Sequence, residues 1–127
     1  MNLENNEKAL KRLIAYAYRD ANLAHKSAFS KGNSEKNQLL ACVYANKVLT
    51  YISSADTIYL MEDEIVSIEL EQVLHQFKVF VDELIKNVGT DHSHQWTDIE
   101  YIRLVKKLSN YGFEPFEADA KYLQDSE

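Results

Sequence analysis

Apolar residues recur along most of this chain at alternating steps of four and three positions, which is the spacing of one face of an α-helix. One such series lies within residues 3–29 and consists of Leu10, Ile14, Ala17, Ala21, Ala24 and Ala28. A second lies within residues 35–61 and consists of Ala41, Ala45, Val48, Ile52, Ala55 and Tyr59. Each series predicts a helix that buries one side, and the alanines allow close approach of a neighbouring helix.

Two further helices are predicted in the second half of the chain. The third starts with the acidic stretch "MEDE", residues 61–64, because negative charge is favourable at a helix N-terminus. Its apolar series consists of Val66, Leu70, Val73, Phe77, Phe80 and Leu84. The fourth starts at Thr97, where "TDIE" reads as a capping box between Thr97 and Glu100. Its apolar positions are Ile99, Ile102, Leu104, Val105 and Leu108.

The expected breaks between helices coincide with the three glycines of the chain, Gly32, Gly89 and Gly112, which suit C-terminal helix caps. Ser34 is the expected N-cap of the second helix, and Pro115 is placed to begin a short last one. The weak helix formers "SSADT" leave open whether residues 53–63 break the second helix. The pattern predicts an all-α, antiparallel four-helix bundle with a short C-terminal helix, formed by residues 1–127 as a single domain.

Composition narrows the class of protein without naming a function. The 127 residues are 46% hydrophobic and 11% aromatic, which predicts a folded core. Three glycines and one proline argue against a glycine-rich phosphate loop, and the single Cys42 is expected to be a small buried residue. Neither a signal peptide nor an apolar run approaching about 18 residues is evident, so a cytoplasmic protein is expected, with no membrane partner.

Charge is distributed unevenly between the two halves of the chain. Residues 1–55 carry eight Lys and Arg against four Asp and Glu, whereas residues 56–127 carry six against sixteen. The halves can attract each other inside the bundle, or the acidic half can face a basic partner. The run at 62–71 predicts a partner-binding patch of Glu62, Asp63, Glu64, Glu69 and Glu71. Nucleic acid is a less favoured partner because the net charge is −6.

The stretch "GTDHSHQW", residues 89–96, contains the residues most suited to a metal ion. Asp91, His92 and His94 offer one oxygen and two nitrogens, which zinc and other divalent ions accept. The alternative is a polar connection between the third and fourth helices, with Trp96 folding back on the core. A complete site needs a further ligand or a fixed geometry, so the metal-binding interpretation is the weaker one, and no cofactor is expected.

The stretch "LHQFK", residues 74–78, resembles the core motif of histidine phosphotransfer domains, His-x-Leu-Lys-Gly. His75 takes the place of the phosphorylated histidine and Lys78 that of the lysine three positions later. The resemblance implies a four-helix bundle that passes a phosphoryl group through His75. Val79 and Phe80 replace the small residues of that motif, and their bulk is expected to hinder the docking of a receiver domain.

The stretch "RDANLAH", residues 19–25, is similar to the Arg-(4 to 6)-His element of HEPN-type RNases, including the polar Asp20 after Arg19. The resemblance implies RNA cleavage by Arg19 and His25. Six residues of continuous helix, however, separate these two side chains by about 120° around the axis. Because "ANLA" offers no helix break, the two residues are not expected to converge.

The leading functional hypothesis is therefore a non-enzymatic protein-binding module. It would be a small acidic regulator, inhibitor (of the immunity or anti-defence type) or adaptor that occludes or tethers a partner with a basic surface. The rival hypothesis is a metal-binding or enzymatic bundle that uses Asp91, His92 and His94, or a phosphotransfer module that uses His75. A homo-oligomer is also left open, because the alanine stripe of the first helix could face a second copy.

Overall fold

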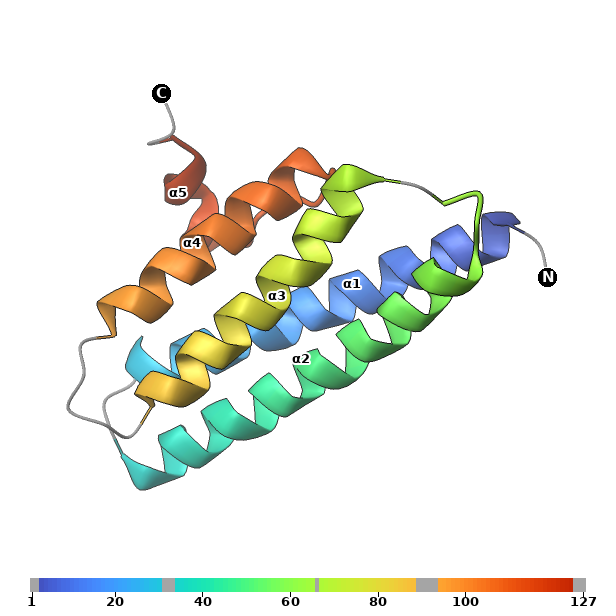
Figure 1. Cartoon of the computed structure of the whole chain (residues 1–127). Coiled ribbons are helices and arrows are strands. Elements are labelled where there is room, and N and C mark those ends of the chain that lie inside the picture. Colours follow the sequence, from blue (N-terminus) through green and yellow to red (C-terminus); the bar gives the residue numbers. More distant parts are fainter. Residues whose placement is uncertain (1–2, 31–33, 66, 89–93, 125–127) are drawn as a thin grey trace.

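The computed structural model describes residues 3–30, 34–65, 67–88 and 94–124, and all regular structure within these ranges is helical. Four long helices run alternately in opposite directions: α1 (Leu3–His25), α2 (Glu35–Met61), α3 (Ile68–Asn87) and α4 (Gln95–Asn110) (Figure 1). A π-helical turn (Lys26–Ser30) continues α1, and a 3₁₀ turn (Glu117–Asp119) leads into the short α5 (Ala120–Gln124). The predicted all-α antiparallel bundle with a short C-terminal helix is confirmed.

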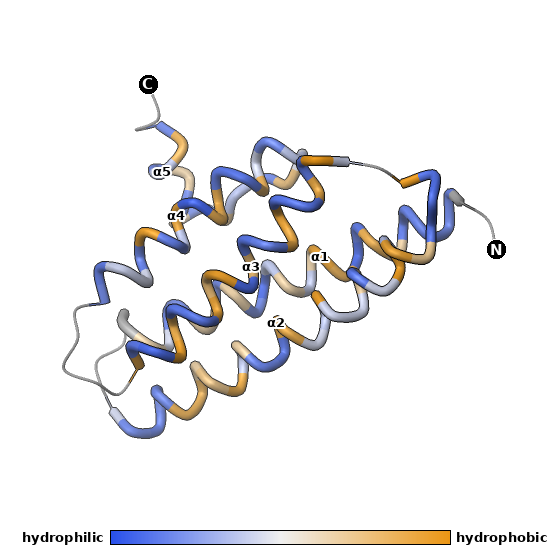
Figure 2. The backbone as a smooth tube through the Cα atoms, viewed as in Figure 1, coloured by the Kyte–Doolittle hydropathy of each residue, from blue (hydrophilic) through white to orange (hydrophobic). Residues whose placement is uncertain are grey.

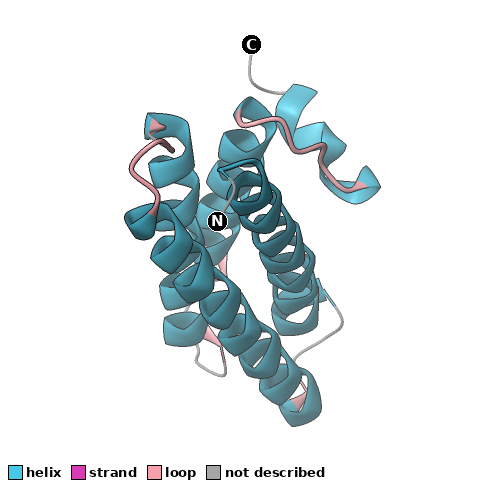
Figure 3. Ribbon diagram, turned by 90° about the vertical axis from the view of Figure 1, so that its right-hand side faces the viewer, coloured by secondary structure: helices cyan, strands magenta, loops and turns pink. Residues whose placement is uncertain are grey.

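The helices form two hairpins, α1 with α2 and α3 with α4, which pack face to face (Figures 1 and 3). Their apolar stripes meet in one core, and the predicted stripe of α1, from Leu10 to Ala28, is buried at all six positions. In α3, the predicted residues from Leu70 to Leu84 are likewise buried. The heptad-like spacing therefore identified the buried face of each of these helices correctly.

The closest packing joins α1 and α2, the most extensively contacting pair of helices. Small side chains line this contact from both sides, and they are fully buried: Ala17, Ala21, Ala24, Ala41, Ala45 and Ala55. Alanine leaves little volume between helix axes, so the two backbones approach closely. The alanine stripe of α1 therefore belongs to the core of the single chain and does not face a second copy.

Several helix ends follow the sequence prediction. The Ser34 hydroxyl caps α2 by accepting from the backbone N–H of Asn37 at 3.2 Å. Residues 53–61 continue α2 without a break. After α4, Gly112 has φ of +104°, and two bonds, Phe113 N–H to the Leu108 carbonyl and Gly112 N–H to the Ser109 carbonyl, complete a Schellman cap. Gly32 and Gly89 lie outside the described residues.

Two predicted helix starts are wrong. Helix α3 begins at Ile68 because the Ser67 hydroxyl accepts from the backbone N–H of Leu70 at 3.1 Å, so residues 62–64 belong to the preceding connection. Helix α4 begins at Gln95, and Thr97 already lies inside its first turn. There the Thr97 hydroxyl bonds Asn87 at 3.1 Å, so the predicted capping box does not form.

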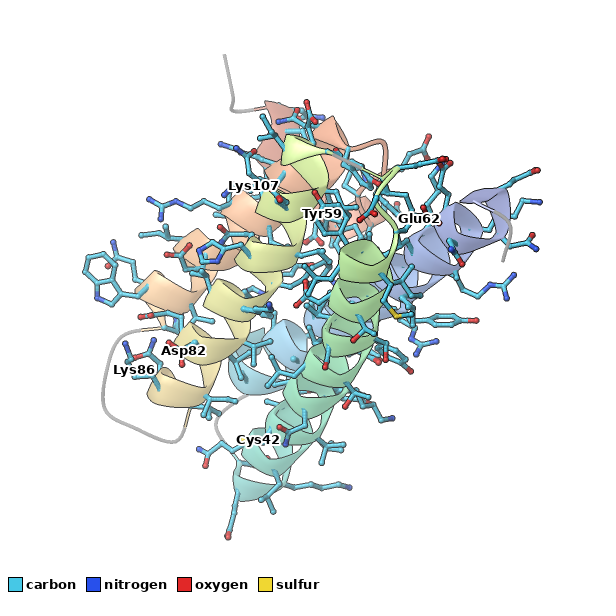
Figure 4. The ribbon with its side chains drawn as sticks, turned by 45° about the vertical axis from the view of Figure 1, so that its right-hand side comes forward. Cys42, Tyr59, Glu62, Asp82, Lys86 and Lys107 are labelled. Atoms are coloured by element: carbon cyan, nitrogen blue, oxygen red, sulfur yellow. The ribbon has the colours of Figure 1, made fainter. Side chains whose placement is uncertain are left out.

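Two side chains are less buried than predicted. Trp96 does not fold back on the core but is 59% exposed on the first turn of α4. Cys42, which was predicted to be a small buried residue, is only partly buried on α2 (Figure 4). Both residues lie at the side of the buried face of their helix. At such positions the apolar repeat alone does not predict how exposed a side chain is.

We expect Ala17→Leu to lower the free energy of unfolding by about 1–3 kcal/mol, because the added atoms have no space between closely packed helices. The matched control is Ala15→Leu, two residues away on the exposed side of α1. The control is expected to change stability by no more than about 0.5 kcal/mol. Urea unfolding followed by circular dichroism measures both, and equal effects of the two variants would contradict the close α1–α2 packing.

Candidate functional site

A group of polar side chains that bond one another lies where the end of α1 meets the start of α4 and the 3₁₀ turn before α5. We call it the polar cluster, and its members are Asn22, His25, His94, Asp98, Tyr101 and Asp119. These residues come from distant parts of the chain: α1 supplies two, α4 and its N-cap residue supply three, and the C-terminal turn supplies one.

Asp98 occupies the outer part of the polar cluster and is shared by two histidines. Its Oδ1 lies 2.7 Å from Nε2 of His25, and its Oδ2 lies 2.8 Å from Nδ1 of His94. A carboxylate only accepts hydrogen bonds, so each ring nitrogen that faces it carries a hydrogen and donates. The His25 side chain is mostly buried and that of His94 is exposed, so the carboxylate joins the core to the surface.

Tyr101 forms the inner part of the polar cluster. Its ring stacks on His25, with centroids 4.4 Å apart and planes within 6°. Its hydroxyl donates to Oδ2 of Asp119 at 2.5 Å and accepts from Nδ2 of Asn22 at 2.7 Å. Asn22 also donates to the same Asp119 oxygen, at 3.2 Å. All three side chains are buried, so these bonds satisfy polar groups that water does not reach.

Burial and the hydrogen bond to Asp119 raise the pKa of Tyr101 above its ordinary value of about 10. Burial, first, and the charge of Asp119, second, raise the pKa of Tyr18. The Tyr18 hydroxyl is the one buried side-chain polar atom of the described residues that makes no hydrogen bond of normal geometry. Its ring packs edge-on against Phe116, with centroids 4.7 Å apart. Both phenols therefore stay protonated at neutral pH.

The geometry of the polar cluster suits a structural link better than a reaction. A histidine–carboxylate pair serves catalysis when it activates a nucleophile within hydrogen-bond reach. Here both Asp98 oxygens bond a histidine, and the nearby Thr97 hydroxyl is taken up by Asn87 at 3.1 Å. Across residues 3–30, 34–65, 67–88 and 94–124, no three His, Cys, Asp or Glu side chains are placed to hold a metal ion.

Only one member of the predicted metal site can be placed. Asp91 and His92 lie outside the described residues, and His94 is the N-cap residue of α4. The Nδ1 atom of His94 faces Asp98, as described above, so this nitrogen is engaged within the helix. Metal binding by Asp91, His92 and His94 therefore stays a prediction.

The two RNase-motif residues point toward different helices. The Arg19 guanidinium pairs with Asp20 at 3.3 Å and reaches the Tyr51 hydroxyl of α2 at 3.5 Å. His25 faces Asp98 and Tyr101 of α4. The π-helical turn begins only after His25, so the intervening helix is regular and the predicted divergence of the two side chains is found.

His75 is exposed on α3, as the phosphotransfer resemblance requires. Lys78, the lysine of that motif, forms an ion pair with Asp56 of α2 at 2.5 Å. Phe80 is fully buried in the core, so the expectation that its bulk would obstruct a docking domain is wrong. Val79 remains on the partly exposed side of the helix beside Lys78. Phosphotransfer through His75 stays a prediction.

A second candidate site is a surface at the connection between α2 and α3, which we call the α2–α3 turn surface. It comprises the acidic residues of the predicted patch and three aliphatic residues beside them. Leu60, Met61 and Ile68 are 78%, 79% and 68% exposed. Asp63, Glu64, Glu69 and Glu71 are also exposed, whereas Glu62 is partly buried.

Three of the five predicted carboxylates have bonds within the chain. Glu62 accepts from Nδ2 of Asn6 at 3.0 Å, and Glu71 accepts from the Tyr59 hydroxyl at 3.1 Å. Glu69 accepts from the Ser67 hydroxyl at 3.3 Å. These bonds fix the shape of the connection, so Asp63 and Glu64 are the carboxylates best placed for an outside contact.

Two hollows border the α2–α3 turn surface. One of about 200 Å³ lies beside Met61 and is lined by Asn5, Asn6, Ala9 and Ile58. The other, of about 320 Å³, lies beside Leu60 and is lined by Asp56, Tyr59, Glu71, Leu74, His75 and Lys78. Exposed aliphatic side chains next to hollows are a feature of protein-binding surfaces.

The basic and acidic halves of the chain are not joined by the Lys and Arg ion pairs that the structure describes, since each of these lies within one half. Instead, His25 and Asp98 link the halves. The attraction predicted between the halves is therefore not made through specific lysine or arginine contacts in the described part of the chain.

No family model, no curated protein and no solved structure matches this chain. In the described ranges, no helix combines the length and apolar composition that crossing a bilayer requires.

Sequence reasoning missed most of the polar cluster. Asn22, Tyr101 and Asp119 are separated by 79 and 18 positions along the chain, and no spacing rule relates them. One signal was available: Asn22 interrupts the alanine-rich part of α1, where a polar residue needs a partner. That signal predicts a buried hydrogen bond but does not identify its partner.

We expect Tyr101→Phe to lower the free energy of unfolding at neutral pH by about 1–3 kcal/mol, because buried Asp119 and Asn22 then lose a hydrogen-bond partner. The control is Tyr16→Phe, whose ring is 40% exposed and which keeps its aromatic contacts. The control is expected to stay within about 0.5 kcal/mol of the unmodified protein. Urea unfolding measures both, and an unchanged Tyr101→Phe variant would show that the buried bonds contribute nothing.

The stability of the unmodified protein and that of Tyr101→Phe are expected to respond differently to alkaline pH. A tyrosine whose pKa is raised by folding gives its full stabilisation below its unfolded pKa of about 10, and loses it as the pH rises through the folded value. We therefore expect the unmodified protein to lose stability above pH 10, and Tyr101→Phe to lose it less steeply. Parallel pH profiles would contradict the raised pKa of Tyr101.

Proposed function

We propose that this protein is a non-enzymatic protein-binding module that contacts its partner through the α2–α3 turn surface. The observation that carries the proposal is the exposure of Leu60, Met61 and Ile68, each more than two-thirds accessible, at one connection. Large aliphatic side chains in contact with water are unfavourable by roughly 1.5–3 kcal/mol each relative to burial. A partner that covers them recovers this free energy.

Charge specifies the kind of partner. Asp63, Glu64 and Glu69 are exposed, and they lie close in sequence to the aliphatic residues, in the connection and in the first turn of α3. Complementary charge accelerates association and discriminates between partners. The partner best suited to this surface is a protein with a basic rim around an apolar centre, whose side chains would enter the hollows beside Leu60 and Met61.

The polar cluster supports a non-enzymatic function indirectly. Its histidines, tyrosine and carboxylates bond one another and thereby join α1, α4 and the C-terminal turn. These bonds support a structural role for the polar cluster. A rigid bundle with an exposed apolar and acidic turn can act by occluding the surface of a partner or by tethering it. This mode of action fits a regulator, inhibitor or adaptor.

The test compares two double charge reversals of equal size. Asp63→Lys with Glu64→Lys changes the α2–α3 turn surface without removing a side-chain bond that holds the connection, whereas Glu114→Lys with Glu117→Lys changes an exposed acidic site elsewhere. A third variant replaces Leu60, Met61 and Ile68 by serine. Partners are captured from the native host by the unmodified protein, purified, and their binding kinetics measured by surface plasmon resonance.

We expect the Asp63/Glu64 reversal to slow association at low salt by about tenfold, with a smaller effect at high salt. The serine variant is expected to accelerate dissociation, and the Glu114/Glu117 control to bind like the unmodified protein. Equal binding by all four proteins would exclude this surface as the contact.

A further inference from the structure

The outer side of α2 carries far less charge than the exposed sides of α1 and α3. Between Asn37 and Met61, eleven residues are exposed and Lys47 alone among them is charged. In contrast, six of nine exposed residues in positions 4–25 of α1 are charged, as are five of nine in α3. In Figure 2 the strongly hydrophilic colour along α2 is limited to short stretches, separated by pale and hydrophobic ones. The charge-poor strip that these eleven residues form does not reflect the overall composition, because 27% of the whole chain is charged.

Apolar groups dominate the first half of this strip. Leu39 and Val43 are 63% and 49% exposed, one helical turn apart. Further along, the Thr50 and Thr57 hydroxyls donate to the carbonyls of Asn46 and Ser53, at 3.1 and 3.0 Å. Because these hydroxyls are satisfied inside the helix, they place little demand on water or on a partner. Depletion of charged residues is typical of the core of a protein interface.

A hollow lies directly beside the strip. It has a volume of about 370 Å³, opens between α2 and α3, and is lined by Leu49, Lys78, Val79, Val81, Asp82 and Ile85. Leu49 belongs to both the hollow and the exposed side of α2, so the projecting Leu39 and Val43 and the hollow form one continuous surface. A projection next to a hollow is self-complementary under a two-fold rotation, as an isologous interface requires.

We propose that this surface is a dimer interface in which α2 of one copy crosses α2 of a second copy in the antiparallel direction, with the two-fold axis at Asn46. This arrangement places Val43 of each copy against the Leu49 side of the hollow in the other copy. It brings the two Asn46 side chains together at the axis, where a buried amide pair fixes the register. The proposal does not depend on the function proposed above.

Charge favours a second copy of this chain as the occupant. Two molecules of net charge −6 repel each other, so they associate only where acidic residues are sparse. The strip on α2 meets this condition, whereas a basic partner would be attracted to the acidic α2–α3 turn surface instead. The hollow carries both signs, Lys78 and Asp82, which again suits self-association better than a partner of one charge.

The available area is also sufficient. The 27 residues of α2 span about 40 Å at 1.5 Å per residue. With α3 alongside at about 8–10 Å, the face is roughly 20 Å wide and offers about 800 Å² per copy. A standard specific interface buries about the same area on each side.

The first test is the mass in solution. Sedimentation equilibrium of the full chain is expected to give twice the 14.7 kDa of one copy, and Val43→Asp is expected to give the single-copy mass with an unchanged helical circular dichroism spectrum. The matched control is Ala15→Asp on the exposed side of α1, which is expected to remain dimeric. A single-copy mass for the unmodified protein up to ~1 mM, or a dimeric Val43→Asp variant, would overturn the proposal.

The second test concerns the position of the axis. In a Cys42→Ser background, Asn46→Cys is expected to form a disulfide-linked dimer under mild oxidation, since residues at a two-fold axis come within disulfide reach. The matched control, Ala15→Cys in the same background, is expected to stay uncrosslinked. Crosslinking at position 15 in preference to position 46 would overturn the proposed arrangement.

Discussion

The close contact between α1 and α2 is the constraint on which the rest of this bundle depends. Fully buried alanines on both helices, among them Ala21 and Ala45, let the two backbones approach without large side chains between them. The largest core residues, Tyr101, Phe77 and Phe80, come from α4 and α3. The division into a tight hairpin and a bulkier one determines which sides of α2 remain outside the core.

The second hairpin is attached through polar side chains as well as through the core. His25, Asn22 and Asp119 bond Asp98 and Tyr101 of α4, so the C-terminal turn is connected to α1. Within the α3–α4 hairpin, the buried Gln76 donates to Glu100 at 2.9 Å and accepts from Lys107 at 3.2 Å. Buried polar groups that bond one another specify a unique arrangement. Since their bonding capacity is used inside the molecule, exposed surfaces are better candidates for function than the polar interior.

The fold was predictable from the sequence because burial in a helical bundle repeats with the helical period. The steps of three and four from Leu10 to Ala28 identified a buried stripe without any knowledge of its partner. The start of α4 was not predictable in the same way, because Thr97 can cap a helix or bond Asn87, and only tertiary packing decides between them. The carboxylates of residues 62–71 were found from their clustering, whereas the significance of Leu60 and Met61 required their exposure, which periodicity does not give.

The most direct test of this account is amide hydrogen exchange resolved by residue. If the alanine seam is the constraint on which the fold depends, the slowest amides lie at the centres of α1 and α2, near Ala21 and Ala45, and exchange only by global unfolding. The amides of α5 are then expected to exchange much faster. Slower exchange at the centres of α3 and α4 than at those of α1 and α2 would show that the second hairpin is the stable unit, and would contradict the account.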